Sequence, residues 1–260
     1  MATVKELFDL TGKTAIITGG GRGLGEQIAE AYAESGVNVV LCSRKVENCQ
    51  ETAERLQSVY GIKTLALECD VTKPEDVQTV VDQTIRKLGR IDILVNNSGV
   101  SWGAPAAEMP IDAWKKVIDV NVTGTFLMSQ AVGKKMIEQQ SGKIINMASI
   151  AGLGGTDPDY LDAIGYNTSK GAIITFTKDL AVKWGPYHIH VNAIAPGFFP
   201  TKMSNVVIEK GKDYWLSHTP LRRFGSDDDL KGAAVFLASK ASDYITGDVL
   251  FVDGGSHALT

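Results

Sequence analysis

The sequence predicts an α/β fold: a single doubly wound parallel sheet of about seven strands with helices on both faces. Short apolar and β-branched runs alternate with longer helical patterns along almost the whole chain. Most of these runs are apolar nearly without a break, as in parallel strands covered on both faces. A glycine-rich turn joins the first run to the first helical pattern. Such strand–helix repetition builds the doubly wound sheet known as the Rossmann fold.

The strands are expected in seven runs, and no linker or internal repeat divides them, so residues 1–260 should form one domain. The runs are Thr14–Thr18, Asn38–Cys42, Thr64–Cys69, Ile91–Asn96, Lys143–Met147, His190–Ala195 and Val249–Val252.

Helical patterns lie between the strands. Leu24–Ser35 carries apolar residues along one side, and Ile111–Ile137 and Tyr166–Trp184 are long. Thr72-Lys73-Pro74-Glu75 has the pattern of a capping box with an early proline, and Ser226-x-x-Asp229 resembles one. We therefore expect helices to begin at these two points.

The composition is that of an ordinary soluble globular protein, with 44% apolar residues, 22% charged residues and a net charge of −4. That charge argues against nucleic acid as a partner, because phosphate binding needs clustered Lys and Arg. Three cysteines without metal or redox spacing favour a reducing compartment. The first residues contain no signal-peptide pattern, and no apolar run is long enough to span a membrane. We expect a cytoplasmic protein with no membrane partner.

The first strand–helix junction reads Thr18-Gly19-x-x-x-Gly23-x-Gly25, with Leu24 opening the helix. Glycines here allow unusual dihedral angles and let backbone N–H groups approach a pyrophosphate at the helix N-terminus. A glycine turn without a ligand is the alternative. The position of the turn in the fold favours a dinucleotide site.

The end of the second strand indicates which dinucleotide is bound. NAD sites usually place an acid there, and NADP sites an arginine. The sequence has Ser43 and Arg44 at this point and no acid before Glu47, and Arg22 in the glycine turn adds a second guanidinium. Two cations near a phosphate dianion favour NADP. The alternative is that Arg44 and Lys45 only open a solvated helix.

A proton-transfer pair is indicated by Tyr166 and Lys170, which lie four residues apart on one helix face. A tyrosine can protonate a carbonyl oxygen if a nearby cation lowers its pKa toward neutrality. Ser149 follows a predicted strand, at the sheet edge where α/β proteins bind ligands. Together these residues predict hydride transfer to or from a carbonyl or alcohol carbon.

On these motifs the sequence resembles the compact branch of the short-chain dehydrogenase/reductase family over essentially the whole chain. The other matching segments are Asp70-Val71, Asn96-Asn97-Ser98-Gly99, Val120-Asn121-Val122, Pro196-Gly197-x-x-x-Thr201 and Val252-Asp253-Gly254-Gly255.

The resemblance implies four catalytic residues. Tyr166 would be the general acid in reduction and the base in oxidation, and Ser149 would bind the substrate oxygen. Lys170 would hold the nicotinamide ribose and lower the Tyr166 pKa, and Asn121 would position a water that links Lys170 to solvent. The expected cofactor residues are Gly19, Arg22, Gly23, Leu24, Gly25, Ser43, Arg44, Asp70, Val71, Asn97, Ser98, Gly99, Tyr166, Lys170, Pro196, Gly197, Phe199 and Thr201.

Two departures from the family pattern concern the site. Ser98 stands where the family usually has Ala. The stretch between Ser149 and Tyr166 is longer than usual, and its extra residues, 154–162, carry three acids. This loop is either a solvated excursion or a lid or wall of the substrate pocket. Aromatic residues near the glycine-containing segments suggest a moderately apolar pocket, although such residues serve as often in packing. The expected substrate contacts are Trp102, Tyr160, Phe198 and Met203.

The four histidines have no ligand spacing, and we expect no metal. The predicted function is NADPH-dependent reduction of a ketone, reversible as alcohol oxidation, on a small-molecule substrate. The resemblance is closest to 3-oxoacyl-carrier-protein reductases and gluconate 5-dehydrogenase-like enzymes. Alternatives are an NAD-preferring polyol or sugar-acid dehydrogenase and a cofactor-binding protein without chemistry. A sugar-nucleotide epimerase is disfavoured because the stretch after Pro196-Gly197 is short.

The resemblance also implies a homotetramer with 222 symmetry. The two long helices would pair about one axis through apolar residues, and Val249–Val252 would lie at another. The alternative is that these residues are buried within one subunit. The apolar residues of the two long helices in question are Phe126, Met128, Val132, Ile174, Phe176 and Leu180.

Overall fold

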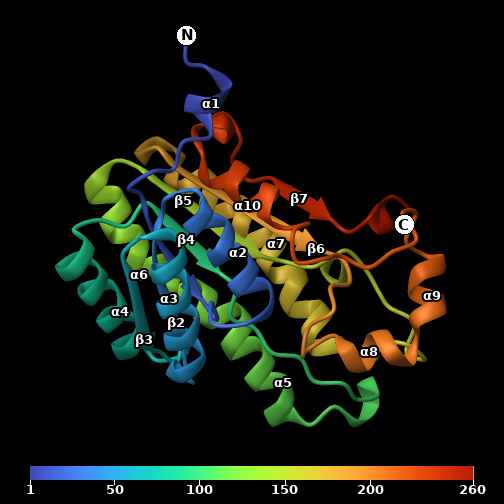
Figure 1. Cartoon of the computed structure of the whole chain (residues 1–260). Coiled ribbons are helices and arrows are strands. Elements are labelled where there is room, and N and C mark those ends of the chain that lie inside the picture. Colours follow the sequence, from blue (N-terminus) through green and yellow to red (C-terminus); the bar gives the residue numbers. More distant parts are fainter. Residues whose placement is uncertain (260) are drawn as a thin grey trace.

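The computed structural model describes residues 1–259, which form one seven-stranded sheet with the order β3-β2-β1-β4-β5-β6-β7 (Figure 1). Every strand pair is parallel. The strands are β1 (Thr14–Thr18), β2 (Asn38–Ser43), β3 (Thr64–Glu68), β4 (Ile93–Asn96), β5 (Gly142–Met147), β6 (Ile189–Pro196) and β7 (Val249–Val252). The predicted doubly wound fold is confirmed, and all seven predicted strands are present with ends within two residues.

Helices cover both faces of the sheet. Side chains of α2, α3 and α10 pack on one face, and those of α4, α6 and α7 pack on the other. The helices are α1 (Val4–Leu7), α2 (Gly23–Glu34), α3 (Val46–Tyr60), α4 (Pro74–Leu88), α5 (Ile111–Ile118), α6 (Gly124–Gln139), α7 (Ile164–Trp184), α8 (Asn205–Lys210), α9 (Lys212–Ser217) and α10 (Lys231–Ala238). Figure 1 shows α8 and α9 together at one end of the molecule, near the C-terminus.

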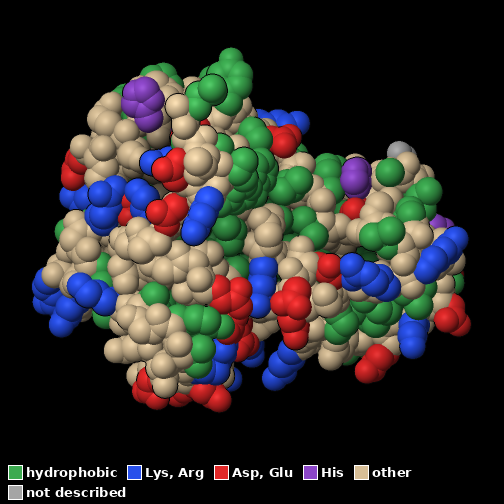
Figure 2. Space-filling view, turned by 45° about the horizontal axis from the view of Figure 1, so that its top comes forward, with side chains coloured by type: hydrophobic (Ala, Val, Ile, Leu, Met, Phe, Trp, Pro, Cys, Tyr) green, Lys and Arg blue, Asp and Glu red, His purple; other side chains and the backbone are tan. Residues whose placement is uncertain are grey.

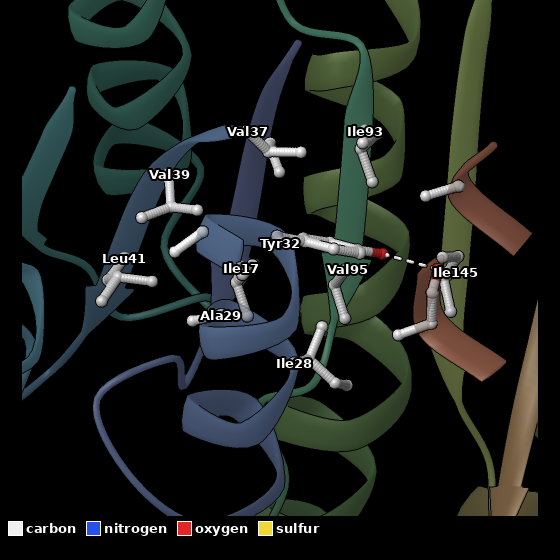
Figure 3. Packing of buried hydrophobic residues seen from close by; sticks show 14 of the residues in the cluster. Ile17, Ile28, Ala29, Tyr32, Val37, Val39, Leu41, Ile93, Val95 and Ile145 are labelled. Carbon is white, nitrogen blue, oxygen red and sulfur yellow. Dashed lines mark hydrogen bonds between the residues drawn. The ribbon is translucent and has the colours of Figure 1, made fainter. Parts of the chain in front are cut away.

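The core explains why the strands read as apolar without a break. Every residue of β1 and β4 is buried, whereas the edge strands β3 and β7 are only partly buried. Figure 3 shows Tyr32 of α2 lying across the sheet among Ile17, Val95 and Ile145. Its hydroxyl donates to the Ala234 carbonyl of α10 at 3.3 Å, which ties two helices of one layer together.

Two predicted helix starts differ from the structure. Pro74 opens α4 as expected, but Lys73 is the N-cap and makes no side-chain cap. The Thr72 hydroxyl donates instead to Asp70 at 2.8 Å, so the Thr72 capping box was wrong. The Ser226 N–H does donate to Asp229 at 2.7 Å, but in a turn that precedes α10, whose N-cap is Leu230.

The strand order places a switch point between β1 and β4, because the chain continues on opposite sides of this pair. Ligands of open α/β sheets bind in the crevice beyond the carboxyl ends of strands at such a point. Gly19 follows β1 and Asn97 follows β4, so both lie at this crevice. No helix within residues 1–259 has the length and apolar character needed to cross a membrane.

Candidate active site

A cavity of about 1220 Å³ opens at the carboxyl ends of the strands. One end is lined by the glycine turn and by Ser43 and Arg44, and the other by residues of α8 and α9. Ser149, Tyr166 and Lys170 line its middle, whereas Asn121 lies behind the wall. The cavity therefore joins the predicted cofactor residues to the predicted catalytic residues in one continuous space.

The glycine turn is shaped by close backbone contacts. Gly19 and Gly23 have positive φ angles of 65° and 56°. A Cβ on Gly25 would lie 2.4 Å from both Asn97 Nδ2 and the Gly19 carbonyl oxygen, so only glycine fits in this first turn of α2. A Cβ on Gly23 would lie 3.6 Å from Thr201 Cγ2, which brings the segment after β6 against the turn.

Thr18 connects the two loops at the switch point. Its hydroxyl accepts from the N–H groups of Asn97 and Ser98, both at 2.9 Å. The Asn97 side chain donates back to the Thr18 and Gly19 carbonyls at 3.0 and 3.2 Å. These bonds fix the loops after β1 and β4 to each other. Ser98 and Gly99 line the cavity beside them.

Three cations gather at the first end of the cavity. Arg22, Arg44 and Lys45 line it, and all three are exposed. None of them takes part in an ion pair with another residue in the range 1–259. Lys45 is also the N-cap of α3, so the positive end of the helix dipole lies at the same place.

Ser43 lines the cavity, but its hydroxyl donates to the Lys45 carbonyl at 2.7 Å. In this structure the Ser43 hydroxyl is therefore not oriented to donate to a phosphate, contrary to the expectation. Asp70 and Val71 also line the cavity. The Asp70 carboxylate accepts from the Thr72 N–H at 3.1 Å, and the hydrogen bonds from Thr72 hold its pKa below the usual value against the opposing effect of burial.

The catalytic candidates are brought together by a 3₁₀ turn, Ile150–Gly152, that packs on α7. Ser149 caps this turn by accepting from the Ala151 N–H at 3.1 Å. A Cβ on Gly152 would lie 2.6 Å from the Lys170 carbonyl carbon. The absence of a side chain at Gly152 therefore lets the turn sit directly on the helix that carries Tyr166 and Lys170.

Lys170 is buried, at 6% exposure, and its ammonium donates to the Met147 carbonyl at 2.6 Å. It also lies 5.5 Å from the centroid of the Tyr166 ring. Burial lowers the pKa of Lys170 to about 8.

The Tyr166 pKa departs from the expectation. Burial raises it, and a hydrogen bond with Ser149 opposes that rise without overcoming it. The predicted depression of the Tyr166 pKa by Lys170 is not observed; the Lys170 ammonium donates to the Met147 carbonyl, and burial of Tyr166 is the larger effect. Tyr166 is therefore protonated at neutral pH, the form that a general acid requires.

Asn121 lies in a π-helical segment, Asp119–Thr123, between α5 and α6. Its side chain accepts from the Val100 N–H at 2.8 Å and donates to the Val100 carbonyl and the Ser169 hydroxyl, both at 2.9 Å. Ser169 in turn donates to the Tyr166 carbonyl at 2.7 Å. The amide thus ties the loop after β4 to the helix of Tyr166. Single π turns are common at functional sites.

The segment after β6 completes the cofactor side. Pro196, Gly197 and Thr201 line the cavity. Phe199 contributes to the lining as well, but its side chain is only 4% exposed and belongs to the core. A Cβ on Gly225 would lie 2.3 Å from its ring. Phe199 thus anchors the segment by its side chain.

Of the four residues predicted to contact the substrate, the structure brings two to the cavity. Phe198 and Met203 line the cavity. Trp102 is 47% exposed and lies outside the lining, and Tyr160 stacks on Tyr214 behind it. Neither is brought to the cavity, because the directions of loop side chains depend on tertiary contacts that local sequence does not encode. The lining residues that the sequence did not indicate include Leu153, Val207, His218, Ser256, His257 and Leu259.

The long loop, residues 154–162, forms a wall of the cavity through Gly155, Thr156, Asp157 and Leu161. The Thr156 hydroxyl donates to the Leu161 carbonyl at 2.8 Å, and the Ala104 N–H donates to the Asp162 carbonyl at 2.9 Å. Of the two alternatives for this loop, the pocket wall is the one observed. Within residues 1–259, no group of three His, Cys, Asp or Glu side chains is placed to hold a metal.

Figure 2 shows basic and acidic side chains beside one another over much of the face in view, and hydrophobic side chains among them on the right. The right is the side on which α8 and α9 lie in Figure 1.

Sequence comparisons cover nearly the whole chain. A family model described as Enoyl-(Acyl carrier protein) reductase matches residues 19–257. The chain is 37% identical to a 3-oxoacyl-acyl-carrier-protein reductase of Aquifex aeolicus, a match that covers 95% of this chain and 98% of the relative. It is 38% identical to a 5-keto-D-gluconate 5-reductase of Escherichia coli, with 97% and 98% covered.

A similar solved structure is a gluconate 5-dehydrogenase of Burkholderia cenocepacia in complex with NADP and tartrate. It matches with a TM-score of 0.93 and 36% identity, covering 98% of this chain and 99% of that chain. The likeness thus extends through the glycine turn, the catalytic candidates and the segments that enclose the cavity.

Proposed function

The chain belongs to the short-chain dehydrogenase/reductase family, and we propose that it is an NADP(H)-dependent oxidoreductase that interconverts a ketone and a secondary alcohol. The observation that carries this proposal is the convergence of Ser149, Tyr166 and Lys170 in one cavity that continues to the glycine turn. Members of the family act as oxidoreductases on CH–OH and C=O groups.

The residues present fit a nicotinamide dinucleotide. Gly19, Gly23 and Leu24 line the cavity where α2 begins, and Gly25, which does not line it, lets Asn97 and the Gly19 carbonyl pack closely behind the turn. Gly19, Arg22, Gly23 and Leu24 would hold the pyrophosphate, and Asp70 and Val71 the adenine. Asn97 to Gly99, Gly197 and Thr201 would hold the nicotinamide half. The bound cofactor would supply or accept the hydride.

The chain's own side chains would bind the substrate oxygen and transfer its proton. In reduction, Ser149 donates a hydrogen bond to the carbonyl oxygen and Tyr166 gives that oxygen its proton. In oxidation, Tyr166 takes the proton back. The buried Lys170 ammonium, 5.5 Å from the centroid of the Tyr166 ring, would hold the nicotinamide ribose. Asn121 positions the Tyr166 helix through Ser169.

The preference for NADP rests on Arg22, Arg44 and Lys45. All three line the cavity without an ion-pair partner in the described chain, and the N-terminus of α3 adds a further positive end. A phosphate dianion would gain charge-assisted hydrogen bonds there, whereas a ribose hydroxyl would gain little. We also propose a cytoplasmic location, in keeping with three free, buried cysteines, and a homotetramer.

The test is a panel of ketones, keto acids and 3-oxoacyl thioesters, assayed with NADPH and with NADH. Consumption of NADPH with a higher kcat/KM than NADH is the expected result. Tight cofactor binding with no turnover of any carbonyl compound would replace the proposal with that of a binding protein. A higher kcat/KM with NADH would leave the reaction standing and overturn the cofactor preference.

A further inference from the structure

Resting on the proposed function, we propose that the substrate is a ketone with a bulky apolar group, such as an aryl or long alkyl group, rather than a polyhydroxylated acid. The part of the cavity beyond Ser149 and Tyr166 has a largely apolar lining. Its apolar wall comes from the long loop, the segment after β6 and the helices α8 and α9. The wall residues are Leu153, Leu161, Phe198, Met203, Val207 and Trp215.

The apolar wall is already assembled without a substrate, because aromatic contacts join the long loop to α9 and α9 to the segment after β6. Tyr160 of the loop stacks on Tyr214 of α9, with ring centroids 3.7 Å apart and an interplanar angle of 10°. Trp215 meets Tyr160 edge-on at 5.9 Å and packs on Phe198 at 4.3 Å. A Cβ on Gly211 would lie 2.7 Å from the Tyr160 ring, so the contact is close. Such pairs add specific stabilisation beyond the area they bury.

Three polar groups around this wall donate to carbonyls of the protein itself. The indole N–H of Trp215 donates to the Val207 carbonyl at 3.1 Å. The hydroxyls of Thr156 and Thr219 donate to the carbonyls of Leu161 and Trp215 at 2.8 and 2.9 Å. A hydroxyl has one proton to give, so these two have none left for a substrate.

The charged side chains in this part of the cavity are also poorly suited to bind a sugar acid. Beyond the cofactor end and Lys170, the Asp and Lys side chains that line it in the described chain are Asp157 and Lys202. Both are exposed to solvent. His218 and His257 line the cavity as well; Nδ1 of His218 contacts the Tyr214 carbonyl, and Nδ1 of His257 contacts the Asp253 carboxylate. Within residues 1–259, Lys202 is thus the lysine on this side of the cavity, and because it is exposed and hydrated, a substrate carboxylate would gain little from pairing with it.

These features set the selectivity. A polyhydroxylated acid entering this space would exchange hydrogen bonds with water for contacts with hydrocarbon, which is unfavourable for each unpaired hydroxyl. An aryl or alkyl group would gain by the same exchange, because the wall is apolar and already assembled. We therefore expect apolar ketones to have a lower KM than polyhydroxylated acids.

The experiment compares 4-phenyl-2-butanone with 5-keto-D-gluconate, both with NADPH. The expected kcat/KM is at least about tenfold higher for the phenyl ketone, within the range that apolar pockets achieve. In Leu153→Asn, the KM for the phenyl ketone should rise about tenfold with little change in kcat. Leu153 is 45% exposed, so the substitution leaves the core intact, and Met203→Asn at 52% exposure repeats the test.

Val59→Asn is the control, because Val59 lies on α3 outside the cavity and is 62% exposed. Equal or higher kcat/KM with 5-keto-D-gluconate would overturn the inference while leaving the proposed function intact. The same KM in Leu153→Asn, Met203→Asn and Val59→Asn would also overturn it. No turnover of any carbonyl compound with either cofactor would overturn the proposed function itself, and the inference with it.

Discussion

Arg44 is the residue on which the cofactor preference depends most. It lies exposed at the cavity, where its charge helps to lower the Asp70 pKa, and no carboxylate in residues 1–259 lies within 4 Å of it. Arg44→Asp should raise the KM for NADPH about 10- to 100-fold, because a charge-assisted contact is lost and a repulsion is added. The KM for NADH should fall. Steady-state kinetics with both cofactors would measure this.

Arg86→Asp is the matched control, since Arg86 is an exposed arginine of α4 outside the cavity. If Arg44→Asp and Arg86→Asp changed the NADPH kinetics equally, Arg44 would have no specific role in cofactor choice.

Lys170 provides a test by pH. Burial lowers its pKa to about 8, below the value of about 10.4 for an unfolded lysine. Between these values the unfolded chain binds a proton that the folded chain lacks, so stability rises with pH in this window. The free energy of unfolding of the wild type, relative to Lys170→Met, should gain up to about 3 kcal/mol from about pH 8 to about pH 10.5.

Urea unfolding of both proteins at several pH values measures that gain. A difference between them that stays constant across the window would show that Lys170 titrates as an ordinary exposed lysine.

The sequence predicted some of the site residues well and others poorly. Ser149, Tyr166 and Lys170 follow local rules, namely a strand end and a four-residue helical spacing, and they meet as expected. Trp102 and Tyr160 do not reach the cavity, because contacts distant in sequence direct their side chains. The Tyr166 pKa likewise depends on burial, which a pair spacing does not reveal.

At the scale of the elements, the contact between the turn at Gly152 and α7 positions Ser149 against Tyr166. A Cβ on Gly152 would meet backbone atoms of Lys170 and Gly171 at 2.6 and 2.7 Å. Gly152→Ala should therefore push the turn away and lower kcat at least about tenfold, with a loss of about 1–3 kcal/mol in stability. Kinetics and thermal unfolding measure the two effects.

Gly232→Ala is the control for this change, because a Cβ there would meet nothing within 4 Å and Gly232 lies inside α10. It should leave kcat unchanged and keep or raise stability. Wild-type kcat in Gly152→Ala would mean that the turn does not set the position of Ser149.

The elements themselves were largely predictable. Continuous apolar runs give all seven strands, because a parallel sheet buries both faces of its central strands. The capping box at Thr72 failed because a nearer acceptor, Asp70, takes the Thr72 hydroxyl. The π-helical segment at Asn121 left no signal in the apolar pattern, since one inserted residue hardly changes the spacing.

At the scale of the whole molecule, we expect a homotetramer. Met128, Val132 and Leu180, assigned to a subunit contact from the sequence, are buried within the chain. Phe126 of α6 and Val182 of α7 remain 45% and 80% exposed, which leaves apolar surface on both long helices. Sedimentation equilibrium at micromolar concentration should give four times the chain mass. A single species near 27.9 kDa would refute the tetramer.

The central claim is that Tyr166 exchanges a proton with the substrate oxygen in a cavity that also binds the dinucleotide. The most direct measurement combines turnover and NADPH binding in Tyr166→Phe, which removes one hydroxyl and keeps the ring. Tyr166→Phe should lower kcat at least about 10²- to 10⁴-fold and leave the Kd for NADPH nearly unchanged. Wild-type turnover in Tyr166→Phe would contradict the central claim.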